Sequence, residues 1–416
     1  MQEFWVSWCQ RLSARCVRDM RSRCLVLDIV ECRHVSTDFP NLPNLPNLLS
    51  GSCSPSDIAC VLKFANPWRK YEALRPKCAR IHRSSLFHNL TESSVSTAGF
   101  IAGHLAPAEA PTAALRAELL VNESVAILGI ASRFGAGCND PDSFWDKLMA
   151  RVDAMVEIPL SRWNLDAHYD VEPGQVGKMY TRKHAFVEGS ELFDAAFFGI
   201  SPAEAKEMDP QQRQLLEVGY SALHHAGYRK ATLMGTDGGV FVGQMNYDFL
   251  LMSAETRSAP TPLTGVGGHP AVSSGRFSYT FGLKGPSYTV DTACSSSLVA
   301  VDGAAQNLRR GRCGVAVAAG VNLILSPGTS ISACATRTTS DACKTFDASA
   351  NGYGRGEGFG AVVLTRLSDA EKEKQSILAV LRGTAVNQDG RSSSLTAPNG
   401  PSQQEVIRTA LRDGQV

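Results

Sequence analysis

GPSYTVDTACSSSLVAV, residues 285–301, joins a short β-branched segment to a run with helical spacing. Tyr288–Val290 combines aromatic and β-branched side chains, which favours a strand. From Ser295 onward the apolar residues recur at helical intervals, and Gly311 follows as a helix end. Cys294 is therefore predicted to lie at a turn between a strand and a helix.

Cys294 at such a turn has two interpretations. The N–H groups of a helix's first turn lack intrahelical acceptors and the helix dipole is positive there, so the position favours a thiolate. A thiolate can attack a thioester carbonyl and hold the acyl group covalently, while the same N–H groups help to stabilise the oxyanion. The alternative is a buried structural cysteine, because cysteine is among the residue types that are most often buried. Spacing alone leaves both open.

Further motifs flank this segment on both sides. In chain order they are VAILGIASRF (125–134), FDAAFFGISP (193–202), MDPQQRQLLE (208–217), SSGRFSY (273–279), DACKTFDASANGYGRGEG (341–358) and NQDGRSSSLTAPNGPSQ (387–403). Together with DTACSSSL they resemble the β-ketoacyl synthase (ketosynthase) family, in the form found in modular polyketide synthases and polyunsaturated fatty-acid synthases. The resemblance covers residues 122–416 and identifies Cys294 as the acyl-accepting nucleophile.

The resemblance implies an α/β fold of the thiolase-like type, with layers in the order αβαβα. Such a domain consists of two similar halves. We expect a ketosynthase domain at 122–416, with the nucleophile half complete at 122–370 and the second half only begun at 377–416. The region 1–120 lies outside the resemblance, and its repeated prolines in PNLPNLPNLL predict a mostly irregular leader of unknown role, with short elements at 61–64 or 113–120.

Two histidines of the family's second half would promote decarboxylation of the extender and stabilise the enolate. None of the nine histidines of this chain follows Cys294, and the last is His269. Three explanations are open, in this order: a truncated gene model or fragment, a split protein completed by another chain, or a non-condensing relative.

For function, the resemblance implies decarboxylative Claisen condensation. An acyl thioester would load Cys294, and a malonyl-type extender would react with it to give a 3-oxoacyl product in polyketide or fatty-acid biosynthesis. We expect an acyl carrier protein that carries the phosphopantetheine arm as partner, and a homodimer or larger synthase complex. No tightly bound cofactor and no metal are expected. The alternative is a non-condensing partner or scaffold that binds acyl carriers.

Phe346, Tyr353 and Gly354 are weaker candidates for substrate binding. The resemblance places NGYGRGEGFG, residues 351–360, beside the nucleophile. Its alternating glycines lack the spacing of a phosphate-binding loop, so we interpret them as permitting close passage of the backbone. Phe346 and Tyr353 would line the acyl channel, although core packing explains them equally well. Asp291 is expected to hydrogen-bond the backbone and shape the turn.

The remaining sequence alternates strand and helix signals. Apolar runs predict buried strands at 125–130, 239–243, 315–319, 361–364 and 377–381. Helices are predicted at 143–149, after an N-cap at Ser201, from Pro210 toward Gly227, and after Ser402, which we expect to cap a last helix toward Leu411. This alternation is typical of an α/β domain in which helices cover a sheet.

Composition limits the partners and the location. The 416 residues are 44% hydrophobic and 19% charged with a net charge of +1, which gives no electrostatic reason to expect nucleic acid. No apolar run approaches the roughly 18 residues of a spanning helix, so no membrane span is expected. The twelve cysteines, seven of them before residue 79, contain no CxxC pair, and we expect reduced thiols. Location defaults to the cytoplasm, with a plastid as the alternative.

Overall fold

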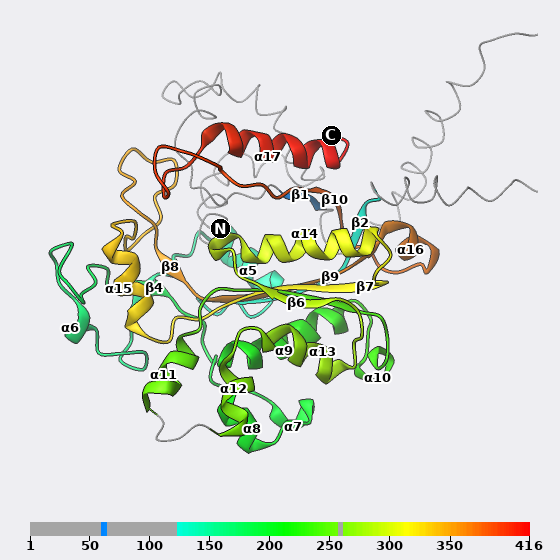
Figure 1. Ribbon diagram of the computed structural model, residues 1–416, viewed down its shortest axis with the longest axis horizontal. Coiled ribbons are helices and arrows are strands. Elements are labelled where there is room, and N and C mark those ends of the chain that lie inside the picture. Colours follow the sequence, from blue (N-terminus) through cyan, green and yellow to red (C-terminus); the bar gives the residue numbers. More distant parts are fainter. Residues whose placement is uncertain (1–59, 65–122, 257–260) are drawn as a thin grey trace, which may run out of the picture.

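The computed structural model describes residues 60–64, 123–256 and 261–416, which form a layered α/β structure around a seven-stranded sheet (Figure 1). The strands are β1 Cys60–Phe64, β2 Val125–Phe134, β3 Val156–Glu157, β4 Lys183–Ala185, β5 Gly239–Gln244, β6 Ser287–Val290, β7 Val315–Asn322, β8 Arg355–Gly356, β9 Gly358–Arg366 and β10 Ala379–Thr384. The helices are α5 Pro141–Met149, α6 Leu165–His168, α7 Ala195–Phe198, α8 Pro202–Glu207, α9 Pro210–His225, α10 Lys230–Leu233, α11 Asp248–Thr256, α12 Pro262–Gly268, α13 Val272–Phe281, α14 Ser296–Arg309, α15 Pro327–Ala335, α16 Leu367–Lys372 and α17 Gly400–Asp413.

The large sheet has the strand order β1-β10-β2-β9-β7-β5-β6, and β3, β4 and β8 form a small second sheet. Strands β6, β5 and β7 run parallel to one another, while β9 is antiparallel to both β7 and β2. The carboxyl ends of the three parallel strands therefore meet at one edge of the sheet. The five strands predicted from apolar runs are present, as β2, β5, β7, β9 and β10, and the strand predicted at Tyr288–Val290 is β6.

The two faces of the sheet carry separate cores because strand residues alternate between them. On β5, Val240 and Val242 belong to the core under α9 and α13, whereas Phe241 belongs to the core under α14. Figure 1 shows α14 on one face of the sheet and α9 and α13 on the other. The core under α9 and α13 is built from bulky side chains, among them Leu215, Leu216, Phe277, Phe281, Val317, Phe359 and Val363.

The face under α14 is lined by smaller residues. Ala316 and Ala318 of β7 share a core with Ala300 and Ala304 of α14. Because protein interiors are close-packed, small side chains on both partners bring the helix close to the sheet. The start of α14 then lies over the edge where the parallel strands end.

Local sequence signals explain where the helices on the opposite face begin. The Asp209 carboxylate accepts a hydrogen bond from Gln211 N at 2.8 Å, and Pro210 occupies the first turn of α9. The Ser201 hydroxyl accepts from Glu204 N at 3.2 Å, so the predicted cap of α8 is confirmed.

The last helix begins earlier than predicted. α17 starts at Gly400, and its N-cap is Asn399, whose side chain accepts from Ser402 N at 3.4 Å. Ser402 lies inside the first turn, where its hydroxyl donates to Asp389 O at 3.2 Å, so the prediction that Ser402 caps this helix is wrong. The proline after Gly400 explains the shift, because its fixed φ suits the first helical positions.

One strand of the leader lies within the described residues. β1 pairs antiparallel with β10, and it coincides with the short element predicted at 61–64. The rest of the leader, including the element predicted at 113–120, lies outside the described residues.

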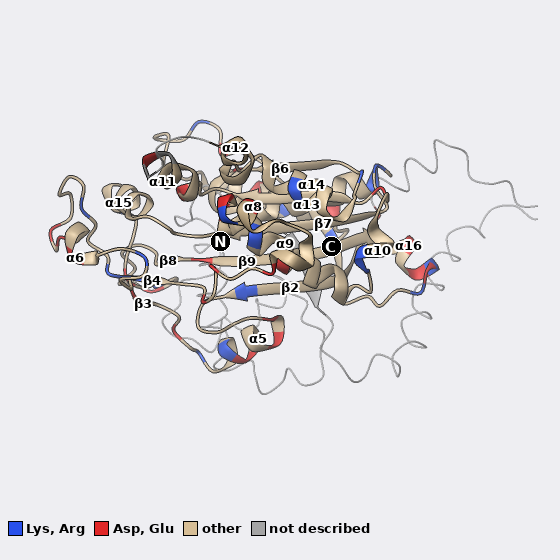
Figure 2. Cartoon of the chain, turned by 90° about the horizontal axis from the view of Figure 1, so that it is seen from below, with Lys and Arg blue, Asp and Glu red and all other residues tan. Residues whose placement is uncertain are grey.

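Charged residues of both signs are scattered along the described chain (Figure 2). Among the helices of the described residues, none has the length and apolar character needed to cross a membrane.

Candidate active site

Cys294 lies between the edge strand of the sheet and the helix that covers its face. The chain leaves β6 at Val290, passes through a 3-10 turn at Ala293–Ser295 and enters α14 at Ser296. The strand-to-helix turn predicted from the sequence is therefore confirmed. Cys294 is exposed and its thiol is free, so a substrate can reach the sulfur from solvent.

The backbone of this turn is strained at one residue. Ala293 has a φ of 56°, in the left-handed region, which costs a residue with a side chain roughly 1–3 kcal/mol. Asp291 Oδ1 accepts a hydrogen bond from Ala293 N at 2.9 Å, and the Ser296 hydroxyl donates to Ala293 O at 2.7 Å. Thr292 N donates to the same hydroxyl at 2.8 Å. Asp291 thus shapes the turn as predicted, and these bonds hold the strained conformation.

Two serines after Cys294 anchor the turn in the interior. Ser295 and Ser296 are only 6% and 5% exposed, and Ser295 Oγ donates to Thr292 O at 2.8 Å. Because its neighbours are fixed inside, the turn holds the Cys294 thiol outward at the start of α14. The positive end of the helix dipole is suited to stabilise negative charge that develops there.

Buried amides link the strand ends beneath this turn. Asn246, just after β5, donates through Nδ2 to Asn322 Oδ1 at the end of β7, at 2.8 Å. Ser273 of α13 donates to Gln244 Oε1 at 2.6 Å. In α/β sheets the crevice outside the carboxyl ends of the strands is where ligands bind, so this network fixes the rim on which a substrate would rest.

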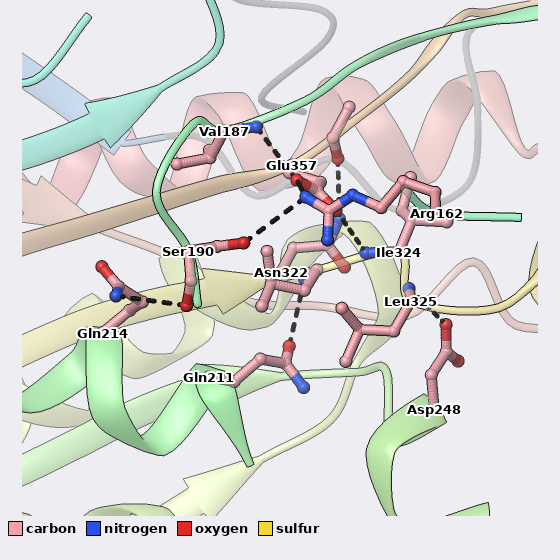
Figure 3. A network of polar contacts seen from close by, with 12 residues as sticks. Arg162, Val187, Ser190, Gln211, Gln214, Asp248, Asn322, Ile324, Leu325 and Glu357 are labelled. Carbon is pink, nitrogen blue, oxygen red and sulfur yellow. Dashed lines mark hydrogen bonds and ion pairs between the residues drawn. The ribbon is translucent and has the colours of Figure 1, made fainter. Parts of the chain in front are cut away.

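A buried carboxylate joins three distant segments near the same edge (Figure 3). Glu357 is 4% exposed and accepts hydrogen bonds from Arg162 Nη2 at 2.7 Å and from the backbone N–H groups of Val187 and Ile324, both at 2.9 Å. Burial raises the pKa of Glu357, and the Arg162 guanidinium opposes that rise. Sequence reasoning assigned no role to Glu357. The glycines around Glu357, directly before a buried strand, indicate a close approach of the backbone, but nothing near Glu357 in the sequence indicates the partners of its side chain.

Asp248 plays a similar part at the end of β7. Its Oδ2 accepts from Leu325 N at 3.0 Å and from Ser326 N at 3.1 Å, which fixes the chain before α15. Burial raises the pKa of Asp248. No local pattern singles out Asp248 in the sequence, because its partners lie more than seventy positions away.

The weaker substrate-binding candidates lie on the segment that leads into β8. Phe346 is 55% exposed and has a φ of 63°. Tyr353 pairs with the chain at Thr339 in an isolated bridge. A side chain at Gly354 would come within 2.6 Å of the Met155 terminal methyl, so this glycine permits a close approach. That these three residues bind substrate, with Phe346 and Tyr353 lining an acyl channel, stays a prediction.

The other described cysteines have structural surroundings. Cys313 and Cys334 are buried at 1% and 2% exposure, and burial raises the pKa of Cys313 to about 11. Cys343 is partly buried and its sulfur accepts from Gly354 N at 3.2 Å. The cysteines with described side chains are free, and the seven before residue 79 lie outside that set. Within the described residues, no cluster of His, Cys, Asp and Glu could hold a metal ion.

Family models match nearly all of the chain after the leader. The model of the β-ketoacyl synthase N-terminal domain matches residues 122–370, and that of the C-terminal domain matches 378–416. Polyketide synthase GfsB of Streptomyces halstedii is 48% identical over 299 residues, which are 71% of this chain and 5% of the relative. The pikromycin polyketide synthase component PikAII of Streptomyces venezuelae is 46% identical over 72% of this chain and 8% of the relative.

Solved structures agree with these matches. The ketosynthase from module 6 of the bacillaene synthase of Bacillus subtilis 168 aligns with a TM-score of 0.64 and 36% identity, over 70% of this chain and 49% of the other. The oxazolomycin ketosynthase domain OzmH KS7 of Streptomyces albus JA3453 aligns with a TM-score of 0.66 and 34% identity, over 71% of this chain and 52% of the other. The chain thus spans about half the length of these structures and a small part of the curated relatives. The layered fold class predicted from the sequence is confirmed.

Proposed function

Because the chain belongs to the β-ketoacyl synthase family, we propose that Cys294 takes an acyl group from a thioester and holds it for a condensation that forms a carbon–carbon bond. The observation that carries this proposal is the exposed thiol of Cys294 on a strained turn at the start of a helix. A purely structural cysteine would be buried, as Cys313 and Cys334 are.

In the loading step, the Cys294 thiolate attacks the thioester carbonyl and its electron pair forms the new C–S bond. The carbonyl oxygen becomes an oxyanion, which N–H donors at the start of α14 are placed to stabilise. When the oxyanion collapses, the bond to the donor sulfur breaks and the donor leaves as a thiolate, which takes up a proton. The acyl group is then held on Cys294.

In the condensation step, a malonyl-type thioester loses carbon dioxide, and the electron pair of the broken bond gives an enolate. The enolate carbon attacks the acyl carbonyl on Cys294, and the cysteine thiolate leaves. The product is a 3-oxoacyl thioester, as expected of a 3-oxoacyl-carrier-protein synthase. The family resemblance gives the acid–base work to histidines of the second half. The chain spans 49% of one solved ketosynthase, so the complete reaction is proposed for the whole protein.

The proposed domain is residues 122–416, with the nucleophile half at 122–370 and the second half beginning at 377. The family-model matches over 122–370 and 378–416 support this division.

The proposed partner is an acyl carrier protein whose phosphopantetheine arm presents the thioester, and the polyketide synthase relatives support it. They also favour a polyketide product and a condensing enzyme over a scaffold. These bacterial relatives lend no support to a plastid location, and the cytoplasm stays a proposal.

A homodimer is also proposed. β6 is the outermost strand at one end of the large sheet, and its residues Ser287 and Tyr288 are exposed. An edge strand presents unpaired backbone groups that can pair with a second copy. Sedimentation at micromolar concentrations checks this proposal, and a monomer across that range would contradict it.

Acylation of the intact chain tests the nucleophile. The chain is incubated with an acyl thioester of N-acetylcysteamine, and peptide mass spectrometry locates the acyl group. We expect one acyl group on Cys294, none in Cys294→Ala, and normal labelling in the matched control Cys343→Ala. Equal labelling of Cys294→Ala would show that another residue is the nucleophile. A chain that binds an acyl carrier protein but forms no acyl-cysteine would favour the scaffold alternative.

A further inference from the structure

We infer that Gly243 and Gly320 are positioning residues for Cys294, because their missing side chains let the first turn of α14 rest directly on the sheet. The inference rests on the proposed function of Cys294 as a nucleophile. Gly243 is on β5 and Gly320 on β7, and the two are paired in register on neighbouring parallel strands. Strand alternation places both on the face covered by α14, since Phe241 and Ala318 on the same strands face that helix.

Gly243 lies under the backbone of α14. A Cβ atom at this position would come within 2.5 Å of both Ser296 C and Ser297 N, and within 2.7 Å of Ser296 O. These are backbone atoms of the first turn, so no change of rotamer can relieve the overlap. The turn itself would have to move away from the sheet.

Gly320 lies under a side chain of the same turn. A Cβ atom there would come within 2.6 Å of Ser297 Cβ, while the nearest backbone atom, Ser297 Cα, is 3.7 Å away. The obstacle at Gly320 is therefore one carbon of one serine. This difference between the two glycines makes their roles separable by experiment.

A displacement of this turn would reach the nucleophile through hydrogen bonds. The Ser296 hydroxyl accepts from Thr292 N at 2.8 Å and donates to Ala293 O at 2.7 Å, so Ser296 is tied to both residues that precede Cys294. Raising Ser296 and Ser297 above the sheet would carry Cys294 away from the rim formed by the strand ends. Misplacement by about 1 Å can slow a reaction by as much as about a hundredfold.

Gly360 of β9 provides a matched control. It is paired directly with Gly320 and lies in the same row of the sheet, yet a Cβ atom there would meet nothing within 4 Å. Gly360→Ala therefore makes the same chemical change, in the same row, without touching α14. All three variants replace a strand glycine by alanine, so the control shares the general cost or gain of that substitution.

The experiment compares acylation rates of the full chain. The rate of acyl transfer from an N-acetylcysteamine thioester to Cys294, and the rate of its alkylation by iodoacetamide, are measured for Gly243→Ala, Gly320→Ala and Gly360→Ala. We expect acylation to slow by about tenfold to a hundredfold in the first two variants, and by less than about twofold in Gly360→Ala, where no contact is made.

Removal of the obstructing carbon gives the decisive comparison. Ser297→Gly should restore the acylation rate of Gly320→Ala to that of Ser297→Gly alone, because the obstacle at Gly320 is Ser297 Cβ. The same change should not restore Gly243→Ala, whose obstacle is backbone. A loss caused only by a smaller folded fraction would not follow this pattern, and thermal unfolding of each variant measures that fraction.

Several results would overturn the inference. These are wild-type rates in Gly243→Ala and Gly320→Ala, an equal loss in Gly360→Ala, or rescue by Ser297→Gly of both variants or of neither. If Gly320→Ala fails to fold, the double variant Gly320→Ala with Ser297→Gly is the test. The double variant should fold, because it lacks the obstructing Ser297 Cβ, and its failure to fold would contradict the inference. If the wild-type chain is alkylated but never acylated, the proposed function fails, and the alkylation rates still test the positioning.

Discussion

The residue before Cys294 adopts a conformation that disfavours any side chain. At a φ of 56°, the Cβ of Ala293 crowds the following carbonyl. We expect Ala293→Val to lower the free energy of unfolding by about 2 kcal/mol, because a β-branched side chain fits the left-handed region worst. Ala293→Gly should raise it slightly or leave it unchanged. Urea denaturation measures both changes.

The control for this prediction is Ala196→Val, a change at an exposed position in α7. It introduces the same side chain where φ is helical, so its cost should stay within about 1 kcal/mol. If valine cost no more at Ala293 than at Ala196, the turn would not be strained in solution.

Single residues were predictable where their signal is local. Cys294 and Asp291 stand out because a strand signal and a helix signal meet around them within a few positions. The strain at Ala293 and the role of Glu357 were not predictable. Glu357 accepts hydrogen bonds from Arg162 and Val187, which lie 195 and 170 positions away, and no local sequence pattern predicts partners at such distances.

At the level of elements, α14 connects the nucleophile turn to the part of the chain that matches the C-terminal domain. Arg309, in its last turn, is 2% exposed and bonds Asp413 of α17 through two contacts, at 3.1 and 2.8 Å. The same guanidinium donates to Arg382 O of β10 at 3.0 Å and to Glu123 O at 2.9 Å. One buried cation therefore holds α14, β10 and α17 together.

Arg309→Met should loosen this connection. The change leaves the Asp413 carboxylate without its cationic partner, with only the backbone N–H of Thr384 still donating to it. Because Asp413 is partly exposed, we expect a cost near the lower end of the roughly 3–5 kcal/mol that follows loss of one member of a buried pair. Arg310→Met is the matched control, because Arg310 is the next residue along the chain and its side chain is exposed. This change should cost less than about 0.5 kcal/mol. Urea denaturation and hydrogen exchange in α17 check both effects. Equal costs for the two variants would contradict the role of Arg309.

Elements were predictable where one kind of signal dominates. The strands were found because runs such as GVFVG are apolar on both faces, as strands covered on two sides must be. The start of α17 was misplaced because Ser402 fits the capping pattern as well as Asn399 does, and only the folded chain decides between them. The close approach at Gly243 and Gly320 depends on the pairing of two distant strands, which no spacing reveals.

For the whole molecule, alternation of strands and helices was sufficient to predict a layered α/β fold. It could not give the strand order, because β10 pairs with β2 across more than 250 positions.

Two buried titratable groups in this structure respond to pH in opposite directions. Burial raises the pKa of Asp209 from 3.8 to about 6, and burial together with Arg355 lowers the pKa of His184 from 6.5 to about 4.

The signs of these two contributions differ. Folded Asp209 keeps a proton that the unfolded chain loses above pH 3.8, so its stabilising contribution is lost as the pH rises through 6. Folded His184 stays neutral while the unfolded chain takes up a proton below pH 6.5, so its contribution is lost as the pH falls from 6.5 toward 4. Between pH 7.5 and 5.5 each contribution amounts to about 1 kcal/mol. Because they oppose one another, these two contributions should largely cancel in the difference in unfolding free energy between the two pH values.

Removal of either titratable group should make the pH-dependent contribution of the other one measurable. In Asp209→Asn, acidification from pH 7.5 to 5.5 should destabilise the protein by about 1 kcal/mol more than in the wild type. In His184→Gln, acidification should stabilise the protein by about 1 kcal/mol more than in the wild type, because the contribution of Asp209 is then no longer opposed by His184. Asp194→Asn, a change at an exposed helix cap, should keep the wild-type difference. Urea denaturation at both pH values provides the measurement. If Asp209→Asn and wild type showed the same pH difference, Asp209 would be ionised in the folded protein throughout this pH range. The buried carboxylate at the N-terminus of α9 would then have to be stabilised by groups other than those that contact it here.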